Sequence, residues 1–427
     1  MTQATGKTNI FSAFLLHLHP RTVPASTLRF GLSLGLGGIA AILLCVMFVS
    51  GLLQLLSYVP QPDSAYSSIQ QLYNLGEVGG FVRNVHFWGG NLLVIITFMH
   101  LLRVFFTGAL DQKRRINWLV GLCLFLLVLF ANFTGYLLPW DQLAYWAVTI
   151  FTNMLSYVPL VGESLALTFR GGNEVGPSTL HIFFGMHVGL IPLSVLSLLI
   201  LHFWQVRKAG GLIRRTEGRE ERVLVVPHLI VREIATACVV LALLFTFAAI
   251  VDAPLAEPAN PGQSPNPAKA AWYFMGLQEL LLHLHPTVAI CLIPTLMLVA
   301  LGAIPFIKGS ILPGGYWFGG CRGRRLALVV FLLASCMTFV VIALDEKLLH
   351  GAEALQAADL WLNRGVLPLG MLFLLQVSLY LGLKKRMKYS RAEAVMAIFV
   401  TNIAIIISLT VIGIWFRGSG MILVNPF

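Results

Sequence analysis

The chain has 427 residues, of which 57% are hydrophobic and only 11% are charged, and its formal net charge is +11. A water-soluble protein of this length carries about twice that charged fraction, so a soluble protein is excluded. Several apolar runs exceed about 18 residues, the length needed to cross about 30 Å of hydrocarbon. The composition therefore predicts an all-α polytopic membrane protein.

The apolar runs predict nine membrane-spanning helices. In chain order they are expected over residues 30–57, 80–106, 116–138, 179–205, 229–251, 287–307, 325–344, 366–384 and 394–416. The stretch 9–19 ("NIFSAFLLHLH") is expected to form an amphipathic helix on the membrane surface, and the first 28 residues lack the apolar core of a cleavable signal peptide. A second short surface helix is expected in "PNPAKAAWYFMGLQELLLH" (265–283), after two prolines.

The basic residues are expected to be unequally distributed between the two sides of the membrane. With the N-terminus in the cytoplasm, 23 of the 29 Lys and Arg residues fall on the cytoplasmic, negative (n) side, and 6 fall on the opposite, positive (p) side. The positive-inside rule accounts for this bias, so no nucleic-acid partner is expected. Since the number of helices is odd, the C-terminus is expected on the p side.

The six cysteines form no CxxCH and no paired CxxC motif. They therefore give no support to a zinc site, to a disulfide framework or to covalent c-type haem attached by the usual motif. Most of them fall inside the expected helices, where small apolar packing residues are the simplest interpretation.

Two of the expected helices each carry a pair of histidines. His86 and His100 are 14 residues apart, about 21 Å along a helix and close to a whole number of turns, and His187 and His202 are 15 residues apart. One helix separates the two, so they run in the same direction, and the histidines match in depth. Polar residues at this depth are costly and usually functional. Two pairs of neutral imidazoles are what two bis-histidine haem irons need.

Glycines in the neighbouring helices repeat the same spacing. The pairs, each 14 residues apart, are Gly37 with Gly51 and Gly121 with Gly135. Glycine allows the close approach that a flat macrocycle requires; ordinary packing of small residues between helices is the alternative. Arg83 and Arg103, at the two ends of one histidine helix, are expected to pair with haem propionates, and the alternative is anchoring at the membrane interface.

Several segments together resemble one family. They are "RNVHFWGGNLLVIITFMHLLRVFFTG" (83–108), "TGYLLPWDQLAYWAV" (134–148), and "EPANP" (257–261) followed by "WYF" (272–274). The chain resembles cytochrome b of the cytochrome bc complexes, most closely cytochrome b6 fused to subunit IV, as in bacterial Rieske/cytochrome b complexes. The resemblance covers about residues 25–345 and leaves the last two helices unexplained.

The resemblance implies three parts. Residues 1–222 would form a b6-like four-helix bundle that binds two haems, residues 223–346 a subunit IV-like three-helix domain with the quinol site, and residues 347–427 two additional transmembrane helices. His86 and His187 would hold the p-side haem, and His100 and His202 the n-side haem. Quinol would be oxidised on the p side, with one electron passing to a Rieske protein and the other crossing through both haems to an n-side quinone.

The resemblance also implies residues for the two quinone sites. The p-side quinol site would be lined by Tyr136, Leu138, Pro139, Trp140, Trp272 and Tyr273, with Tyr136 and Tyr273 taking part in catalysis. The n-side quinone site would involve Arg207 and Lys208, for which plain positive-inside charge is the alternative.

Two positions depart from the family pattern. Gly35 stands where the b6 type has the cysteine that attaches an extra haem, so no covalent haem is expected. Ala270 and Ala271 precede Trp272 where the family has PEWY, so the glutamate that takes a quinol proton is missing. Glu279, about two helical turns after Trp272, is the expected replacement. A surface charge is the simpler interpretation of Glu279, and Asp141 and Glu257 are alternative acceptors.

These observations lead to one expectation and two alternatives. The expectation is the cytochrome b subunit of a quinol:cytochrome c (or other acceptor) oxidoreductase, with two non-covalent haems b, in a bacterial cytoplasmic membrane. Its expected partners are a Rieske protein, a c-type cytochrome, membrane lipid and a second copy of the complex. The alternatives are a dihaem membrane anchor of another respiratory enzyme, and a transporter without haem, which would need inverted repeats and broken midplane helices.

Overall fold

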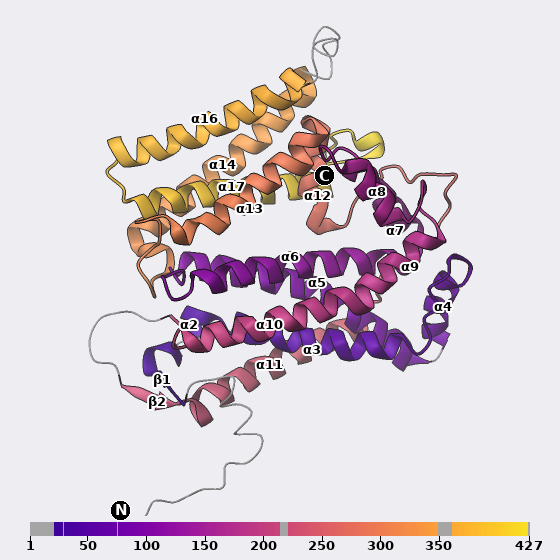
Figure 1. The fold of residues 1–427 in the computed structure, drawn as a ribbon, viewed down its shortest axis with the longest axis horizontal. Helices are drawn as coiled ribbons and strands as arrows, with labels where there is room; N and C mark the ends of the chain where they lie inside the picture. The colour runs from indigo at the N-terminus through magenta and orange to yellow at the C-terminus, as the bar shows by residue number, and fades with distance from the viewer. Residues whose placement is uncertain (1–20, 29, 75, 214–220, 349–360, 426–427) are drawn as a thin grey trace, which may run out of the picture.

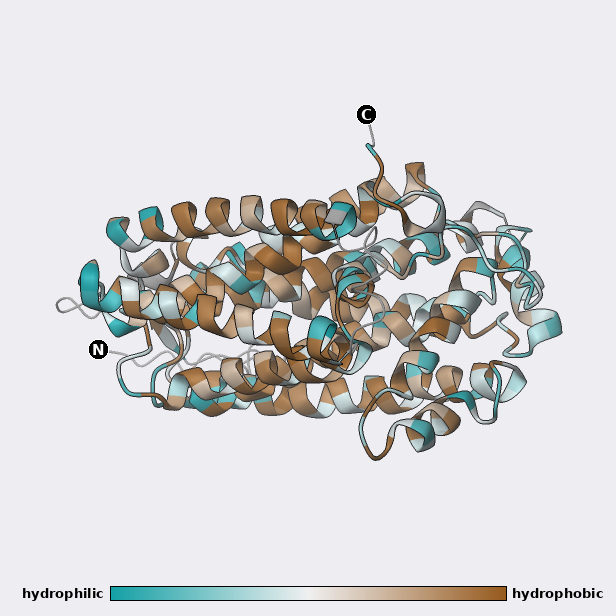
Figure 2. Ribbon diagram, turned by 90° about the horizontal axis from the view of Figure 1, so that it is seen from above, coloured by the Kyte–Doolittle hydropathy of each residue, from teal (hydrophilic) through white to brown (hydrophobic). Residues whose placement is uncertain are grey.

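The computed structural model describes residues 21–28, 30–74, 76–213, 221–348 and 361–425, so the surface helix expected over 9–19 lies outside the described residues. Within these ranges, nine helical segments are long and apolar enough to cross a membrane. They lie side by side along one direction (Figure 1). Hydrophilic residues gather toward the two ends of the helices, and the middle parts are mostly hydrophobic (Figure 2). The all-α polytopic class is confirmed.

The nine spans agree closely with the expected ones. They are α3 (Leu36–Gln54), α5 (Glu77–Phe106), α6 (Arg115–Leu137), α9 (Pro177–Gly185) continuing through η2 (Met186–Leu190) into α10 (Ile191–Lys208), α11 (Val225–Ile250), η4 (Val288–Leu292) with α13 (Ile293–Ala303), α14 (Cys321–Leu348), η7 (Leu362–Val366) with α16 (Leu367–Leu381) and η8 (Gly382–Arg386), and α17 (Arg391–Trp415).

Short elements cover the two ends of the bundle. The end expected on the n side, called the n end below, holds β1 (Thr22–Pro24), antiparallel to β2 (Arg222–Leu224), with η1 (Ala25–Leu28), α2 (Phe30–Ser33), η5 (Ile304–Phe306) and η6 (Trp317–Gly319). The opposite end is called the p end. The p end holds α4 (Pro62–Asn74), α7 (Gln142–Leu155), α8 (Gly162–Arg170), η3 (Trp272–Phe274), α12 (Met275–His283) and η9 (Ser419–Met421). The expected p-side surface helix is thus η3 with α12, and Figure 1 shows α4, α7, α8 and α12 at the same end.

The first span is shorter than expected. A continuous helix was expected over 30–57, but α2 ends at Ser33 and α3 begins at Leu36. Between them Leu34 and Gly35 have φ angles of 52° and 62°. Glycine adopts this left-handed conformation without the steric cost of a Cβ atom, so the chain turns at Gly35 and the helix restarts after it.

Three spans contain a widened π-helical turn that is followed by a proline two residues later, whereas a fourth such turn, η8, ends its span without one. The three turns are η2, η4 and η7, and the prolines are Pro192, Pro294 and Pro368. Proline lacks an N–H donor and its ring clashes with the carbonyl four residues earlier, so a wider turn relieves the conflict. His187 lies in η2, and such turns occur frequently at functional sites.

Packing divides the helices into two groups that share an interface. Helices α3, α5, α6 and α10 form the expected four-helix bundle, and α11 packs against α3 and α5. In the second group α17 packs against both α14 and α12. Half of the apolar window of α17 is buried, against 6% for α16, so the last helix belongs to the interior of this group. The three-part domain division remains a prediction.

Candidate functional site

The structure brings the four histidines together as two pairs. The ring centres of His86 and His187 are 6.1 Å apart, and those of His100 and His202 are 6.5 Å apart. A metal ion bound to two imidazole nitrogens at about 2 Å each separates the ring centres by about 6 Å. In each pair, one histidine lies on α5 and the other on the α9–α10 span. The space between the two rings of each pair is therefore the space that one iron requires.

Each expected glycine lies against one of these histidines. A Cβ atom on Gly51 would lie 3.1 Å from Cε1 of His86, and one on Gly135 would lie 2.5 Å from Cε1 of His187. The other pair shows the same pattern. A Cβ atom on Gly37 would lie 3.2 Å from Cε1 of His100, and one on Gly121 would lie 3.6 Å from Cε1 of His202. The glycine spacing thus follows the histidine spacing because α3 and α6 approach the imidazole rings at both depths.

Hydrogen bonds fix the tautomers of the p-side pair. The Ser50 hydroxyl donates its single hydrogen to the carbonyl of Val46 (2.7 Å), so it must accept from Nδ1 of His86 (2.9 Å). Nδ1 of His187 lies 3.0 Å from the carbonyl of Ala131, which can only accept. Both rings therefore carry the proton on Nδ1 and leave the Nε2 lone pair free. Such outer hydrogen bonds typically orient metal-bound histidines.

At the n-side pair, buried polar atoms lack partners among the described residues. They are Nδ1 of His100, Nδ1 of His202, Nη2 of Arg103 and Oδ1 of Asn117. Buried polar groups are nearly always hydrogen-bonded, so a cluster of unpartnered ones indicates a missing polar group. Arg103 is buried and donates from Nε to the carbonyl of Leu32 (2.9 Å), which leaves Nη2 available to a carboxylate. The residues present fit a haem with a propionate at this end.

Arg83 has a different environment from Arg103. It is buried, and it donates to the hydroxyl of Tyr73 (2.5 Å) and to the carbonyls of Ala253 (2.7 Å) and Pro254 (2.8 Å). These bonds tie α5 to α4 and to the segment after α11. A propionate contact from Arg83 would have to share a guanidinium that already has three partners, so Arg103 is the better placed of the two arginines.

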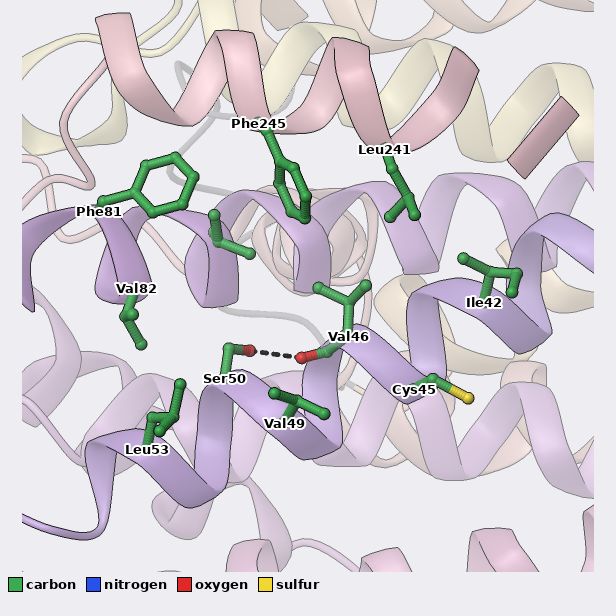
Figure 3. A pocket seen from close by; sticks show the side chains of 11 residues that line it. Ile42, Cys45, Val46, Val49, Ser50, Leu53, Phe81, Val82, Leu241 and Phe245 are labelled. Atoms are coloured by element: carbon green, nitrogen blue, oxygen red, sulfur yellow. Dashed lines mark hydrogen bonds between the residues drawn. The ribbon is translucent and has the colours of Figure 1, made fainter. Parts of the chain in front are cut away.

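An apolar pocket of about 380 Å³ lies beside the p-side pair, between α3, α5 and α11. Ser50 and Val46 of α3 and Phe81 of α5 are among the side chains on its wall (Figure 3). The remaining lining residues are Ile42, Cys45, Val49, Leu53, Val82, Val85, Leu241 and Phe245. Ser50 thus separates this pocket from Nδ1 of His86.

The segments expected at the quinol site meet at the p end. The Ala259 N–H donates to the carbonyl of Trp140 (3.2 Å), and the Ala256 N–H donates to Oδ2 of Asp141 (3.0 Å). Asp141 also caps α7 by accepting from Ala144. Burial raises the pKa of Asp141, although these backbone donors oppose the rise. Both carboxylate oxygens of this alternative proton acceptor are therefore occupied.

The aromatic residues of η3 reach into the helix bundle. Nε1 of Trp272 donates to Oδ1 of Asn91 on α5 (2.6 Å). Burial, and then the nearby Tyr136, raise the pKa of Tyr273 above its ordinary value, so its hydroxyl stays protonated as a hydrogen-bond donor. Leu138 and Pro139 follow α6 directly, and the carbonyl of Leu138 accepts from Tyr58. The expected p-side residues thus come from adjacent elements.

Glu279 is fully buried and paired. Its carboxylate accepts from Arg417 at 2.5 Å and 3.1 Å, and its Oε1 lies 3.2 Å from Nε2 of His283. Burial alone would raise the pKa of Glu279, but the bonds to His283 and Arg417 hold that pKa below its ordinary value. Glu279 is therefore not the solvated surface charge of the simpler interpretation. The other alternative acceptor, Glu257, is exposed.

The n-side candidates lie at the end of α10. Arg207 and Lys208 are exposed, and Nζ of Lys208 lies 5.1 Å from the ring centre of Trp204. Gly35, the position of the missing cysteine, begins α3 with a left-handed φ angle, and a Cβ atom there would lie 3.3 Å from Thr236.

Sequence reasoning missed four residues that the structure places at these sites. They are Ser50, His283, Asp345 and Arg417. His283 follows Glu279 by four residues, a helical spacing that brings side chains together. Arg417 is one of only six basic residues on the sparsely charged side, which marks it as unusual there.

Comparisons with known proteins agree with this geometry. The family model described as cytochrome b/b6/petB matches residues 24–210. Cytochrome b6 of Heliobacterium mobile is 38% identical over 192 residues, which cover 45% of this chain and 88% of that protein. The menaquinol:cytochrome c reductase cytochrome b subunit of Geobacillus thermodenitrificans is 37% identical over 175 residues, covering 41% of this chain and 78% of that protein.

A solved structure extends the likeness of the fold beyond that region. The chain titled "Hyperthermophilic respiratory Complex III" aligns with a TM-score of 0.63 and 23% identity, covering 89% of this chain and 91% of that one. At this identity the likeness concerns the fold alone. Together with the matched region and the relatives above, the two histidine pairs identify this protein as a member of the cytochrome b/b6 family.

Proposed function

We propose that the chain is the cytochrome b subunit of a bc-type complex that oxidises quinol on the p side and reduces quinone on the n side, coupled to proton translocation. The observation that carries this proposal is the presence of two histidine pairs with ring centres 6.1 Å and 6.5 Å apart, each flanked by two glycines. Two haems b held by these pairs would accept and pass on single electrons.

The residues around each pair have separate tasks. Ser50 and Ala131 keep the Nδ1 protons of His86 and His187 in place, so that both Nε2 atoms would be free to bind iron. Arg103 offers a buried, unpartnered Nη2 to a propionate near the n end. With Gly35 in place of the cysteine, the chain has no thiol there for a third, covalent haem.

At the p end, Tyr136, Tyr273 and Trp272 would bind the quinol head group, with Leu138, Pro139 and Trp140 completing the pocket. Support comes from the buried, protonated hydroxyl of Tyr273 beside Tyr136. Glu279 would receive a quinol proton. Burial would raise the pKa of Glu279, but the bonds to His283 and Arg417 hold it below its ordinary value, so the carboxylate would be ionised and able to accept a proton. Arg207 and Lys208 would serve the n-side quinone site.

The assembly follows from the same proposal. The complex would lie in a bacterial cytoplasmic membrane with the N-terminus of this chain in the cytoplasm and its C-terminus in the periplasm. Its partners would be a Rieske iron–sulfur protein, a c-type cytochrome and a second copy of the complex. The names of the relatives, which include a menaquinol:cytochrome c reductase subunit, support an electron acceptor of the cytochrome c class.

The proposal is tested by adding a quinol to the purified, oxidised complex. Reduction of b-type haem, followed by reduction of added cytochrome c or another acceptor, is the expected result. A complex that contains haem b but neither takes electrons from any quinol nor passes them to an acceptor would contradict the proposal and favour a membrane anchor of another enzyme.

A further inference from the structure

Five charged side chains meet at the p end, outside the histidine pairs. They are Glu279 and His283 of α12, Asp345 and Glu346 of α14, and Arg417, which follows α17. Burial decreases along one branch of this p-end cluster: the side chains of Glu279, His283 and Asp345 are 0%, 8% and 17% exposed. The branch therefore leads from the interior toward the surface.

His283 has a hydrogen-bond partner in either protonation state. Its Nδ1 bonds to Oδ2 of Asp345, which accepts a hydrogen in both states. Its Nε2 lies 3.2 Å from Oε1 of Glu279 and 3.0 Å from Nη2 of Arg417. Because arginine only donates and a carboxylate only accepts, a neutral ring bonds to Arg417 and a protonated ring bonds to Glu279. The ring can therefore gain or lose a proton without leaving a buried polar atom unpartnered.

We infer that His283 relays protons outward from the p-side quinol site, receiving them at Nε2 from Glu279 and releasing them at Nδ1 to Asp345. This inference rests on the proposed function and adds an exit route to it. His283 and Asp345 contact no quinol in this scheme, so they are positioning and relay residues.

Only protons move in this step. As the O–H bond of a protonated Glu279 breaks, an N–H bond forms at Nε2 of His283. As the N–H bond at Nδ1 breaks, an O–H bond forms on Asp345, which then gives its proton to water. No group is oxidised or reduced. The starting tautomer returns by proton exchange with water, in which Nε2 loses its proton and Nδ1 gains one.

Arg417 makes the transfer directional. It keeps Glu279 ionised between transfers, so Glu279 does not retain the proton. Burial alone would lower the pKa of His283, but its bonds to Asp345 and Glu279 raise that pKa above 6.5. The proton is thus held more strongly by His283 than by the buried carboxylate. Among the described residues, the charged groups facing His283 are Glu279 from its own helix, Asp345 from α14 and Arg417, which follows α17.

The cluster also gives the last helix a role. α17 packs closely on α12, where Cβ atoms on Gly276 and Gly413 would lie 2.8 Å from Thr410 and 2.9 Å from Met275. This contact positions Arg417 beside Glu279. A purely structural ion pair would explain the Arg417–Glu279 contact, but it would not require a histidine between two carboxylates.

The test compares the effects of removing the charge of Asp345 and of its neighbour Glu346 on the pH dependence of quinol oxidation. In the complete complex, the rate of quinol oxidation at saturating quinol is measured between about pH 5 and pH 9, the range in which a histidine titrates. The rate should rise with pH as His283 becomes neutral. In Asp345→Asn the midpoint of this rise should move to lower pH by about one unit, because an opposite charge raises a histidine pKa by about that much.

Glu346→Gln is the matched control, because Glu346 bonds to Arg417 and not to His283. It should keep the wild-type midpoint, and His283→Gln should remove the pH-dependent rise. An unchanged midpoint in Asp345→Asn with normal haem content, or an equal shift in Glu346→Gln, would overturn the relay. A wild-type rate of quinol oxidation that does not change with pH would by itself overturn the relay. A complex with both haems that oxidises quinol but shows no such shift contradicts the relay alone, whereas a complex that oxidises no quinol contradicts the proposed function as well.

Discussion

Ser50 accepts a hydrogen bond of 2.9 Å from Nδ1 of His86, linking α3 to a histidine of the p-side pair on α5. An acceptor at this nitrogen makes a metal-bound imidazole more basic and stabilises the oxidised metal. Ser50→Ala should therefore raise the midpoint potential of one haem by about 20–60 mV, since a hydrogen bond contributes about 0.5–1.5 kcal/mol and 59 mV corresponds to about 1.4 kcal/mol for one electron. A redox titration followed by optical spectra measures both haems.

Ser194→Ala is the control for that titration. The Ser194 hydroxyl makes the same kind of bond to a carbonyl four residues earlier, at 2.8 Å, but it has no described contact with a histidine. Both potentials should stay unchanged in this variant. Equal potentials in wild type and Ser50→Ala would show that Ser50 does not tune a haem ligand.

Gly135 and Gly121 should differ in their tolerance of a methyl group. A Cβ atom on Gly135 would lie 2.5 Å from His187, which forces the ring to move, whereas one on Gly121 would lie 3.6 Å from His202, an ordinary contact. Gly135→Ala should therefore lose about one of two haems, and Gly121→Ala should keep both. The haem-to-protein ratio of each purified variant measures this, and equal ratios in the two variants would contradict the assigned contacts.

The sequence was informative where local spacing decides the outcome. The nine spans and the pairing of His86 with His187 and His100 with His202 follow from helix length and pitch, and the structure agrees. The partners of Arg83 could not be foreseen, because Ala253 and Pro254 are about 170 residues away and reach it only through the fold of the loop after α11.

The same limit applies to Glu279. Its partner Arg417 is 138 residues away, just after α17, a helix that the family resemblance does not explain. Helical spacing indicates that Glu279 and His283 share a face, but it does not show which element covers that face. The packing of α17 on α12 in the structure shows which element covers it.

Glu279→Gln keeps the size of the side chain and removes the base. Quinol oxidation should fall at least about tenfold, equal to about 1.4 kcal/mol of barrier, with both haems retained. Glu257→Gln is the control, because Glu257 is an exposed carboxylate on the same side. The measurement is the steady-state turnover of the two variants across pH, compared with that of the wild type. Normal turnover in Glu279→Gln would remove this residue from the mechanism.

The p-end cluster should make stability depend on pH in two opposite ways. The pKa of His283 is raised in the folded state, so its contribution is complete below pH 6.5 and is lost as the pH rises through the raised value. The pKa of Glu279 is lowered, so its contribution is present above pH 4.5 and is lost as the pH falls through the lowered value. Thermal unfolding in detergent should show highest stability between these values.

His283→Gln separates the two effects. The decline of the unfolding temperature above pH 6.5 should be weaker in this variant than in wild type, because the titrating ring is gone. An identical decline in both proteins would assign the alkaline loss of stability to another group.

The central claim is that two haems b are held non-covalently by His86 with His187 and by His100 with His202. Pyridine haemochrome analysis of the purified chain tests it most directly. The expected result is about two haems b per chain, all extracted by acidified acetone, with no haem left on the denatured polypeptide. A single haem per chain, or any haem that remains covalently attached, would contradict the account.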